Sequence, residues 1–359
     1  MQRALVTGAT GFIGSHLCEA LVRNGVETHC LVRPTSDTGL LSDLGATLVQ
    51  GDVTQPDQLE EAVADVDVVF HLAGSMAALS RADMMKVNEE GVGLVAAACA
   101  KRETPPTMIL LSSVAASGPV KRNAVRVESD PTAPVSNYGH SKLAGEQAAA
   151  KWADRVPLTI IRPGVVFGPR DRSTLPIFKA IAMWGVHPVV GLGRTRLALV
   201  HVEDLVDLLL KTVCGGERLA ATEGDATQPG QGIYFASHDR ALSYSELGTL
   251  IARAMNRRLL PIPLIPPVTW SAAAVSQLWG QVRRHPDPFN IDKIREAVQP
   301  AWVVSNEKAK QHLRWQPRAS LEEQLHDSVR WYEANRWIKI RRLLRKSRSE
   351  RRAIRDVKR

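Results

Sequence analysis

The sequence of 359 residues is poor in cysteine, with four in all, and in aromatic residues, which make up 5% of the chain. The cysteines lie at positions 18, 30, 99 and 214, and no two of them form a CxxC pair. This spacing argues against a disulfide framework and against a thiolate zinc site. No histidine, cysteine and carboxylate residues recur at metal-ligand spacing either, so we predict no metal site. The scarcity of cysteine favours a reducing, cytoplasmic compartment, and we expect no signal peptide before the first apolar segment at Ala4.

A basic surface across the body of the protein is also missing, although the formal net charge is +9. Residues 336–359 hold twelve Lys or Arg and two acidic residues, a balance of +10, which leaves −1 for residues 1–335. A neutral body offers no electrostatic footprint for a phosphate backbone, so we expect no nucleic-acid partner. The basic tail has two interpretations: an amphipathic helix with Trp337 at an anionic membrane interface, or a solvated extension.

The sequence has no apolar run long enough to span a bilayer. Residues 259–282 carry no charge, but four prolines in the first half interrupt any helix there. This stretch is either a buried part of a cap or a surface that touches a membrane. Together with the tail, it leaves open a peripheral position at the cytoplasmic face.

Short apolar runs alternate with helix-length amphipathic stretches over the first 160 residues, as in βαβ units on a parallel sheet. This rhythm predicts an α/β fold with a doubly wound parallel sheet, and a smaller, discontinuous capping domain toward the C-terminus. The predicted strands are Ala4–Thr7, Thr28–Val32, Thr47–Gln50, Val66–His71, Thr107–Ser112 and Leu158–Arg162. The predicted divisions are 1–163 for the dinucleotide-binding domain with 194–236 returning to it, 164–193 and 237–335 for the substrate cap, and 336–359 for the tail.

Residues 7–14, TGATGFIG, follow a predicted strand and open a predicted helix, which is the context that a dinucleotide-binding glycine turn needs. Gly8 permits the tight turn, Gly11 lets the backbone approach a pyrophosphate, and Gly14 lets the helix pack on the strand. The helix N-terminus adds amide donors and a positive dipole for the phosphates. The residues expected to contact the cofactor here are Gly8, Thr10, Gly11, Phe12, Ile13 and Gly14.

The second predicted strand ends in Val32-Arg33 without an acid. A carboxylate at this place binds a ribose 2′-hydroxyl, whereas a basic side chain accommodates a 2′-phosphate. Arg33, assisted by Ser36, therefore predicts a preference for NADP(H), with NAD(H) as the alternative; a merely solvated arginine is the other interpretation. The ends of the third and fourth strands add four further candidate cofactor contacts, Asp52, Val53, Leu72 and Ala73, although both could be simple strand-terminal turns.

Tyr138 and Lys142, in the segment YGHSK, are four residues apart and so share one face of a helix. A neighbouring cation favours the phenolate, so we expect Lys142 to lower the pKa of Tyr138 toward neutrality. Tyr138 could then exchange a proton with a substrate oxygen while hydride moves to or from the cofactor. Ser113, directly after a predicted strand, is expected to hold that oxygen.

Two further motifs are HLAG at 71–74 and RPGVVFGP at 162–169. Together with the glycine turn, Ser113 and YGHSK, they make the chain resemble the extended short-chain dehydrogenases/reductases of the NAD-dependent epimerase/dehydratase type over about residues 3–335. The resemblance assigns Ser113, Tyr138 and Lys142 to catalysis. It also implies a second role for Lys142 at the nicotinamide ribose, a contact from the loop at Pro163 to the nicotinamide, and a homodimer.

Three departures indicate a branch of this family. Valine stands at position 165, where many sugar-nucleotide epimerases have asparagine; Val114-Ala115 replace the Asp-Glu pair of the dehydratases; and no acid ends the second strand. We therefore expect the branch of dihydroflavonol reductases and 3β-hydroxysteroid dehydrogenases, with hydride transfer to or from a secondary alcohol or ketone on an apolar ring substrate. A sugar or nucleotide-sugar epimerase, and a catalytically silent dinucleotide sensor, are the alternatives.

Overall fold

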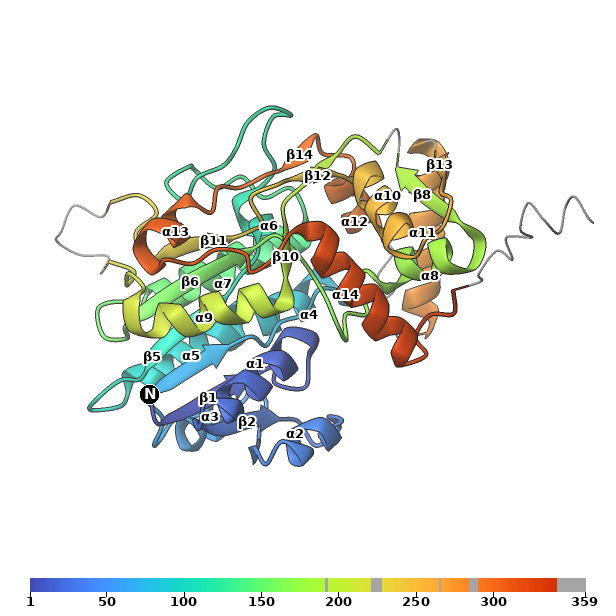
Figure 1. The fold of residues 1–359 in the computed structure, drawn as a ribbon. Helices are drawn as coiled ribbons and strands as arrows, with labels where there is room; N and C mark the ends of the chain where they lie inside the picture. The colour runs from blue at the N-terminus through green and yellow to red at the C-terminus, as the bar shows by residue number, and fades with distance from the viewer. Residues whose placement is uncertain (191–192, 221–227, 265, 284–289, 341–359) are drawn as a thin grey trace, which may run out of the picture.

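A computed structural model describes residues 1–190, 193–220, 228–264, 266–283 and 290–340. Its centre is a seven-stranded sheet of order β11-β6-β5-β4-β1-β2-β3, in which each pair of neighbours is parallel (Figure 1). The strands are β1 (Arg3–Thr7), β2 (Glu27–Val32), β3 (Thr47–Gln50), β4 (Val68–His71), β5 (Thr107–Leu111), β6 (Leu158–Pro163) and β11 (Ile233–Ala236). The doubly wound parallel sheet expected from the apolar runs is confirmed, and the six predicted strands lie within two residues of their observed ends.

Apolar side chains cover both faces of this sheet. On one face, Leu17 and Leu21 of α1 pack with Leu205 and Leu209 of α9, and all four are fully buried. On the other face, α3, α5 and α7 contribute Leu59, Val95 and Ala149 to a second core. The flanking helices are α1 (Phe12–Arg23), α9 (Val202–Gly215), α3 (Pro56–Ala62), α5 (Gly91–Ala100) and α7 (Asn137–Ala150). Helices on both faces leave the carboxyl ends of the strands as the open edge, where ligands bind in such sheets.

Shorter elements surround this core. Near the sheet lie α2 (Gly39–Asp43), α4 (Arg81–Met85), the π-helix Lys86–Glu90, α6 (Val114–Ser117), β7 (Val165–Phe167), which pairs with β10 (Leu199–His201), and α13 (Glu307–Leu313). For the remaining elements we use the name cap: α8 (Leu175–Trp184), β8 (Val186–Val190), β9 (Arg196–Leu197), β12 (Leu242–Ser243), α10 (Tyr244–Ala254), β13 (Leu260–Leu264), α11 (Pro266–Arg283), α12 (Ile291–Ala297), β14 (Ala301–Trp302) and α14 (Leu321–Ala334). Strand β9 lies within 194–236 but pairs with β12 and β14.

The start of the basic tail departs from the expected membrane helix. Residues 336–340 are not helical; Trp337 stacks on Tyr332 at 5.8 Å between ring centroids and meets Trp331 edge-on. Ile340 packs against the same cap core. Trp337 is therefore partly buried against the cap core, through its contacts with the aromatic residues of α14. Residues 341–359 lie outside the described part of the chain.

Candidate active site

The glycine turn joins β1 to α1 and lies against the end of β4. Gly8 adopts φ +70°, and a Cβ atom there would lie 2.7 Å from the backbone nitrogen of Ala73. A Cβ atom on Gly14 would lie 2.2 Å from the carbonyl oxygen of Gly8. The turn and the helix packing therefore require glycine at both positions. Gly11 is the N-cap of α1, and its amide donates to the carbonyl of Gly8. Because Gly11 has no side chain, the backbone at the helix N-terminus stays accessible to a ligand.

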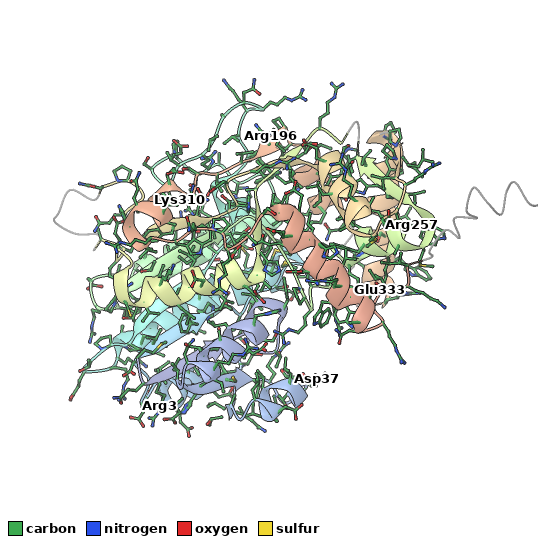
Figure 2. All side chains as sticks on the ribbon, viewed as in Figure 1. Arg3, Asp37, Arg196, Arg257, Lys310 and Glu333 are labelled. Atoms are coloured by element: carbon green, nitrogen blue, oxygen red, sulfur yellow. The ribbon has the colours of Figure 1, made fainter. Side chains whose placement is uncertain are left out.

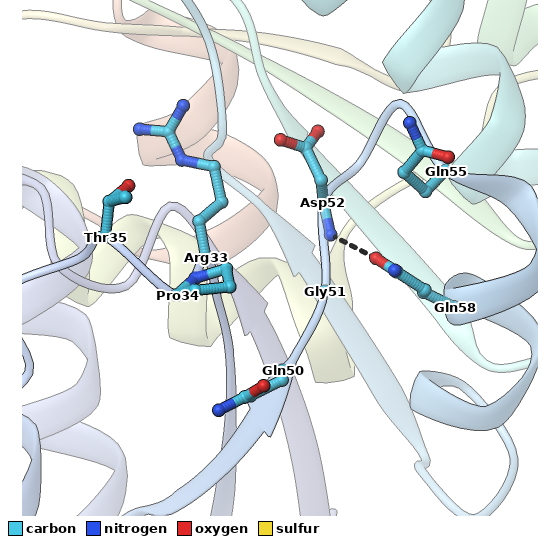
Figure 3. Close-up of a pocket in the computed structure, with 8 residues that line it drawn as sticks. All are labelled: Arg33, Pro34, Thr35, Gln50, Gly51, Asp52, Gln55 and Gln58. Carbon is cyan, nitrogen blue, oxygen red and sulfur yellow. Dashed lines mark hydrogen bonds between the residues drawn. The ribbon is translucent and has the colours of Figure 1, made fainter.

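The ends of β2 and β3 form a pocket of about 310 Å³ (Figure 3). Arg33 and Asp52 point in the same direction from the two strand ends, with Arg33 exposed. The Asp52 carboxylate accepts from the Thr54 amide and hydroxyl, each at 2.9 Å, so its orientation is fixed. The remaining lining residues are Pro34, Thr35, Gln50, Gly51, Gln55 and Gln58. The pocket therefore brings one cation, Arg33, and one carboxylate, Asp52, to the ends of β2 and β3, among uncharged side chains.

The other predicted cofactor residues lie around the same sheet edge. Leu72 and Ala73 continue β4, and the Ala73 amide donates to the Thr7 hydroxyl at 3.2 Å. Val53 is buried behind the pocket, and Pro163 is the last residue of β6. Thr10 is exposed in the turn, whereas Phe12 and Ile13 are partly buried in the first turn of α1. The three glycines of the turn leave room for a pyrophosphate, and the pocket at the ends of β2 and β3 leaves room for a ribose. Together they fit a dinucleotide.

Ser113 is the second residue after β5 and caps α6. Its backbone is extended, and its hydroxyl accepts from the Ala115 amide at 3.1 Å. The same hydroxyl forms a hydrogen bond with the phenol of Tyr138. The end of β5 and the first turn of α7 thus bring Ser113 and Tyr138, 25 positions apart in sequence, next to each other.

Lys142 lies one turn beyond Tyr138 in α7 and is buried. Its ammonium donates to the carbonyl oxygen of Leu111 at 2.7 Å, and a Cβ atom on Gly74 would lie 3.6 Å from Nζ. Lys142 therefore stands where β4 and β5 both end, beside the backbone of the HLAG segment. Burial lowers the pKa of Lys142 to about 8, with Glu146 opposing the shift.

The pKa of Tyr138 differs from the expected lowering. Burial raises it to about 12, Glu296 raises it further, and the hydrogen bond with Ser113 opposes both. Lys142 is not among the groups that shift it, because its ammonium is held at the Leu111 carbonyl. In this structure Tyr138 is thus a neutral proton donor.

Helix α12 of the cap lies over the first turn of α7. The two carboxylate oxygens of Asp292 accept from the amides of Asn137 and Tyr138 at 2.7 and 3.0 Å. The Lys293 ammonium lies 5.2 Å from the centroid of the Tyr138 ring, and Glu296 accepts from the Ser136 hydroxyl at 2.7 Å. Sequence reasoning missed these three cap residues, and no motif marks them.

Asn88, which sequence reasoning also missed, holds the segment around Gly74 against α7. Asn88, fully buried in the π-helix, accepts from the Ser75 amide at 2.7 Å and donates to the Ser75 carbonyl and to the Ser141 hydroxyl. A π-helical turn is a frequent signal of a functional site, but it is visible only in the structure. Asn88 therefore ties the strand end beside Lys142 to the helix that carries Lys142.

Within the described residues, no three His, Cys, Asp or Glu side chains are grouped as a metal site would require, and no helix is long and apolar enough to cross a membrane.

Comparison with known proteins identifies similar chains. Residues 4–217 match the family model described as the NAD dependent epimerase/dehydratase family. A protein named ceramide reductase from Caulobacter vibrioides is 30% identical over 334 residues, covering 93% of this chain and 95% of its own. A putative dihydroflavonol 4-reductase from Synechocystis is 26% identical over 344 residues, covering 93% and 95%. The structure of a dTDP-glucose 4,6-dehydratase from Streptomyces venezuelae with NAD bound superposes with a TM-score of 0.73 at 19% identity, over 94% of this chain and 98% of that one, and so shares the fold.

Proposed function

Because the chain belongs to the NAD-dependent epimerase/dehydratase family and is an enzyme of the extended short-chain dehydrogenase/reductase type, we propose that it transfers hydride between NADP(H) and a secondary alcohol or ketone. The observation that carries the proposal is the meeting of Ser113, Tyr138 and Lys142 at the ends of β4 and β5.

Each of the three residues has a distinct role. A bound NADPH supplies the hydride. Ser113 donates to the substrate oxygen and holds it beside Tyr138, which delivers its phenolic proton as the oxygen gains charge. Lys142, next to the backbone of the HLAG segment, can donate to the ribose hydroxyls of the cofactor. The loop at Pro163 closes the nicotinamide side.

The substrate class is argued from the relatives and from the cap. Relatives are named for a ceramide, which has long acyl chains, and for a dihydroflavonol, which has aromatic rings, and the Val165 side chain offers no hydrogen bond to a sugar nucleotide. We therefore propose an apolar ketone or alcohol, with flavonol-like, steroid-like and sterol-like rings as the first compounds to screen and acyl-chain ketones beside them.

Tyr138→Phe tests the site. We expect loss of NADPH oxidation with every ketone that the wild type reduces, and unchanged NADP+ affinity by calorimetry, since only the proton donor is removed. Tyr244→Phe, which removes a phenol from the cap helix α10, is the matched control and should keep full activity. Retention of turnover by Tyr138→Phe would contradict the assignment.

Arg33→Asp tests the cofactor preference. Tight binding of NADP+ by the wild type should change to preference for NAD+ in the variant, because an acid repels a 2′-phosphate and accepts from a 2′-hydroxyl. Calorimetric titration with both nucleotides measures this. Wild-type protein that binds NAD+ alone, unaffected by the substitution, would overturn the preference.

Two partner proposals stand beside the activity. We propose a homodimer, and contact of the tail with an anionic membrane at the cytoplasmic face through residues 341–359. Because Trp337 and Ile340 belong to the cap core, the tail is best tested with a chain that ends at Ile340, whose binding to anionic vesicles should fall.

A further inference from the structure

Large apolar side chains are exposed on α8, β13 and α11, at the end of the cap that lies away from the parallel sheet in Figure 1. Helix α8 packs on β8, and β8 pairs with β13 in parallel register, so that Leu260 lies opposite Val186. Helix α11 begins two residues after β13 ends. Six exposed side chains on these elements define what we call the cap surface: Met183, Trp184, Leu260, Ile262, Val275 and Trp279.

The cap surface is unusual for this chain. Trp184 and Trp279 are 66% and 53% exposed, and they are the two tryptophans among the described residues that expose more than half of their surface. On α11, Val275 and Trp279 are one helical turn apart, so their two exposed side chains lie on neighbouring parts of the helix surface. Soluble proteins rarely expose such groups together unless a partner covers them.

The two stretches of sequence that contain the cap surface carry charge of one sign. Residues 172–190 and 247–283, which contain its elements, include no Asp or Glu. Their basic residues are Arg172, Lys179, Arg253, Arg257, Arg258 and Arg283. The guanidinium of Arg283 lies 4.8 Å from the centroid of the Trp279 ring, and Figure 2 shows Arg257 at the same end of the molecule, far from Arg3 in the first strand.

The chain beyond the described residues adds charge of the same sign. Residues 341–359 hold ten Lys or Arg and two acidic residues. They begin directly after Ile340, which packs with the core cluster that contains Ile181 and Ala182 of α8. Ile340, the last described residue, therefore packs in the core beneath α8, whose last residues belong to the cap surface.

We propose that the cap surface lies on an anionic lipid bilayer. Exposed tryptophans set among arginines and lysines, with no carboxylate in the surrounding stretches, match the headgroup level of such a membrane, where indole rings and basic side chains are both favoured. A second copy of the chain would instead bring two surfaces of like charge together.

The position of the cap surface relates it to the reaction. Helix α11 contacts α12, and α12 carries Asp292 and Lys293 at Tyr138. An apolar substrate would thus leave the bilayer beside the helices that cover the catalytic residue. This step rests on the proposed function, whereas docking on the bilayer does not.

The test is vesicle sedimentation with the full-length chain, using phosphatidylcholine alone or mixed with an equal part of phosphatidylglycerol. We expect binding to the mixed vesicles, weakened at high salt, and a reduction of about tenfold for Trp184→Ser combined with Trp279→Ser, since two interfacial side chains are removed. The matched control combines Val125→Ser with Val127→Ser, which are also exposed, at 53% and 41%, and should bind as the wild type does.

Unchanged NADP+ affinity and an unchanged unfolding midpoint show that both variants fold. Equal vesicle binding by the double tryptophan variant and the wild type would overturn the proposal. The vesicle binding would then be attributed to residues 341–359 instead of the cap surface. Absence of wild-type binding, or binding that ignores phosphatidylglycerol, would also overturn it. A wild-type dimer that the tryptophan substitutions dissociate would show that a second copy covers this surface. None of these outcomes bears on hydride transfer, which is measured separately with soluble ketones.

Discussion

The buried ion pair beneath the active site leads to a sharp prediction about stability. Glu146 of α7 accepts from Arg162 of β6 through Nε at 2.9 Å and Nη2 at 2.5 Å, and also from the Ser112 hydroxyl. The two side chains are 5% and 4% exposed. Glu146→Gln removes the charge and turns an amide N–H toward the guanidinium, which leaves a buried cation without a counterion. We expect the free energy of unfolding to fall by about 3–5 kcal/mol, a large part of the roughly 5–15 kcal/mol typical of a domain.

Urea unfolding followed by far-UV circular dichroism measures this loss. The control is Glu322→Gln, which breaks the pair between Arg240 and Glu322, whose side chains are 50% and 49% exposed. This change should cost less than about 1 kcal/mol. Replacing both buried partners, as Glu146→Leu with Arg162→Met, should regain most of the stability, because no unpaired charge remains. A Glu146→Gln variant that loses no more stability than the control would refute the reasoning.

Two further predictions concern pH and the cap. Burial lowers the pKa of His71 to about 3, so the folded state keeps this imidazole neutral while the unfolded chain protonates below pH 6.5. The free energy of unfolding should therefore decline as the pH falls below 6.5, by about 2 kcal/mol at pH 5 from this residue. Urea unfolding measures the decline, which His71→Asn should reduce. The control His140→Asn changes an exposed histidine and should leave the decline as it is in the wild type. Asp292→Asn should lower kcat/KM about tenfold without changing cofactor affinity, because hydrogen bonds to a charged group at the first turn of α7 weaken; an unchanged kcat/KM, equal to that of Asp327→Asn on α14, would contradict the role of the cap helix.

The central sheet could be predicted from the sequence because its strands other than the edge strand β3 are mostly buried on both faces and read as short apolar runs. The glycine turn was equally visible, since the left-handed φ of Gly8 and the contact of Gly14 with Gly8 both arise within one βα unit. The catalytic residues Tyr138 and Lys142 carry their own signal in a helical spacing of four. Each of these features depends on residues close together in the chain.

The parts that sequence did not reveal depend on distant contacts. Asp292 meets the amide of Tyr138 across 154 positions, from a short polar helix without a diagnostic period. The aromatic spacing around Trp337 fitted a membrane helix as well as a core contact, and only packing on α14 decides between them. The missing charge in residues 259–282 likewise fitted a buried or an exposed segment; Leu260 and Trp279, at 63% and 53% exposed, belong to the surface.

The most direct measurement follows the hydride itself. NADPH deuterated at the transferred position of C4 is incubated with the protein and with apolar ketones, and the product is analysed by mass spectrometry. The account predicts one deuterium on the carbinol carbon of the product and an equal amount of NADP+, both lost in Tyr138→Phe. Inversion of a sugar carbon with no net oxidation of either reduced nicotinamide would contradict it and identify an epimerase.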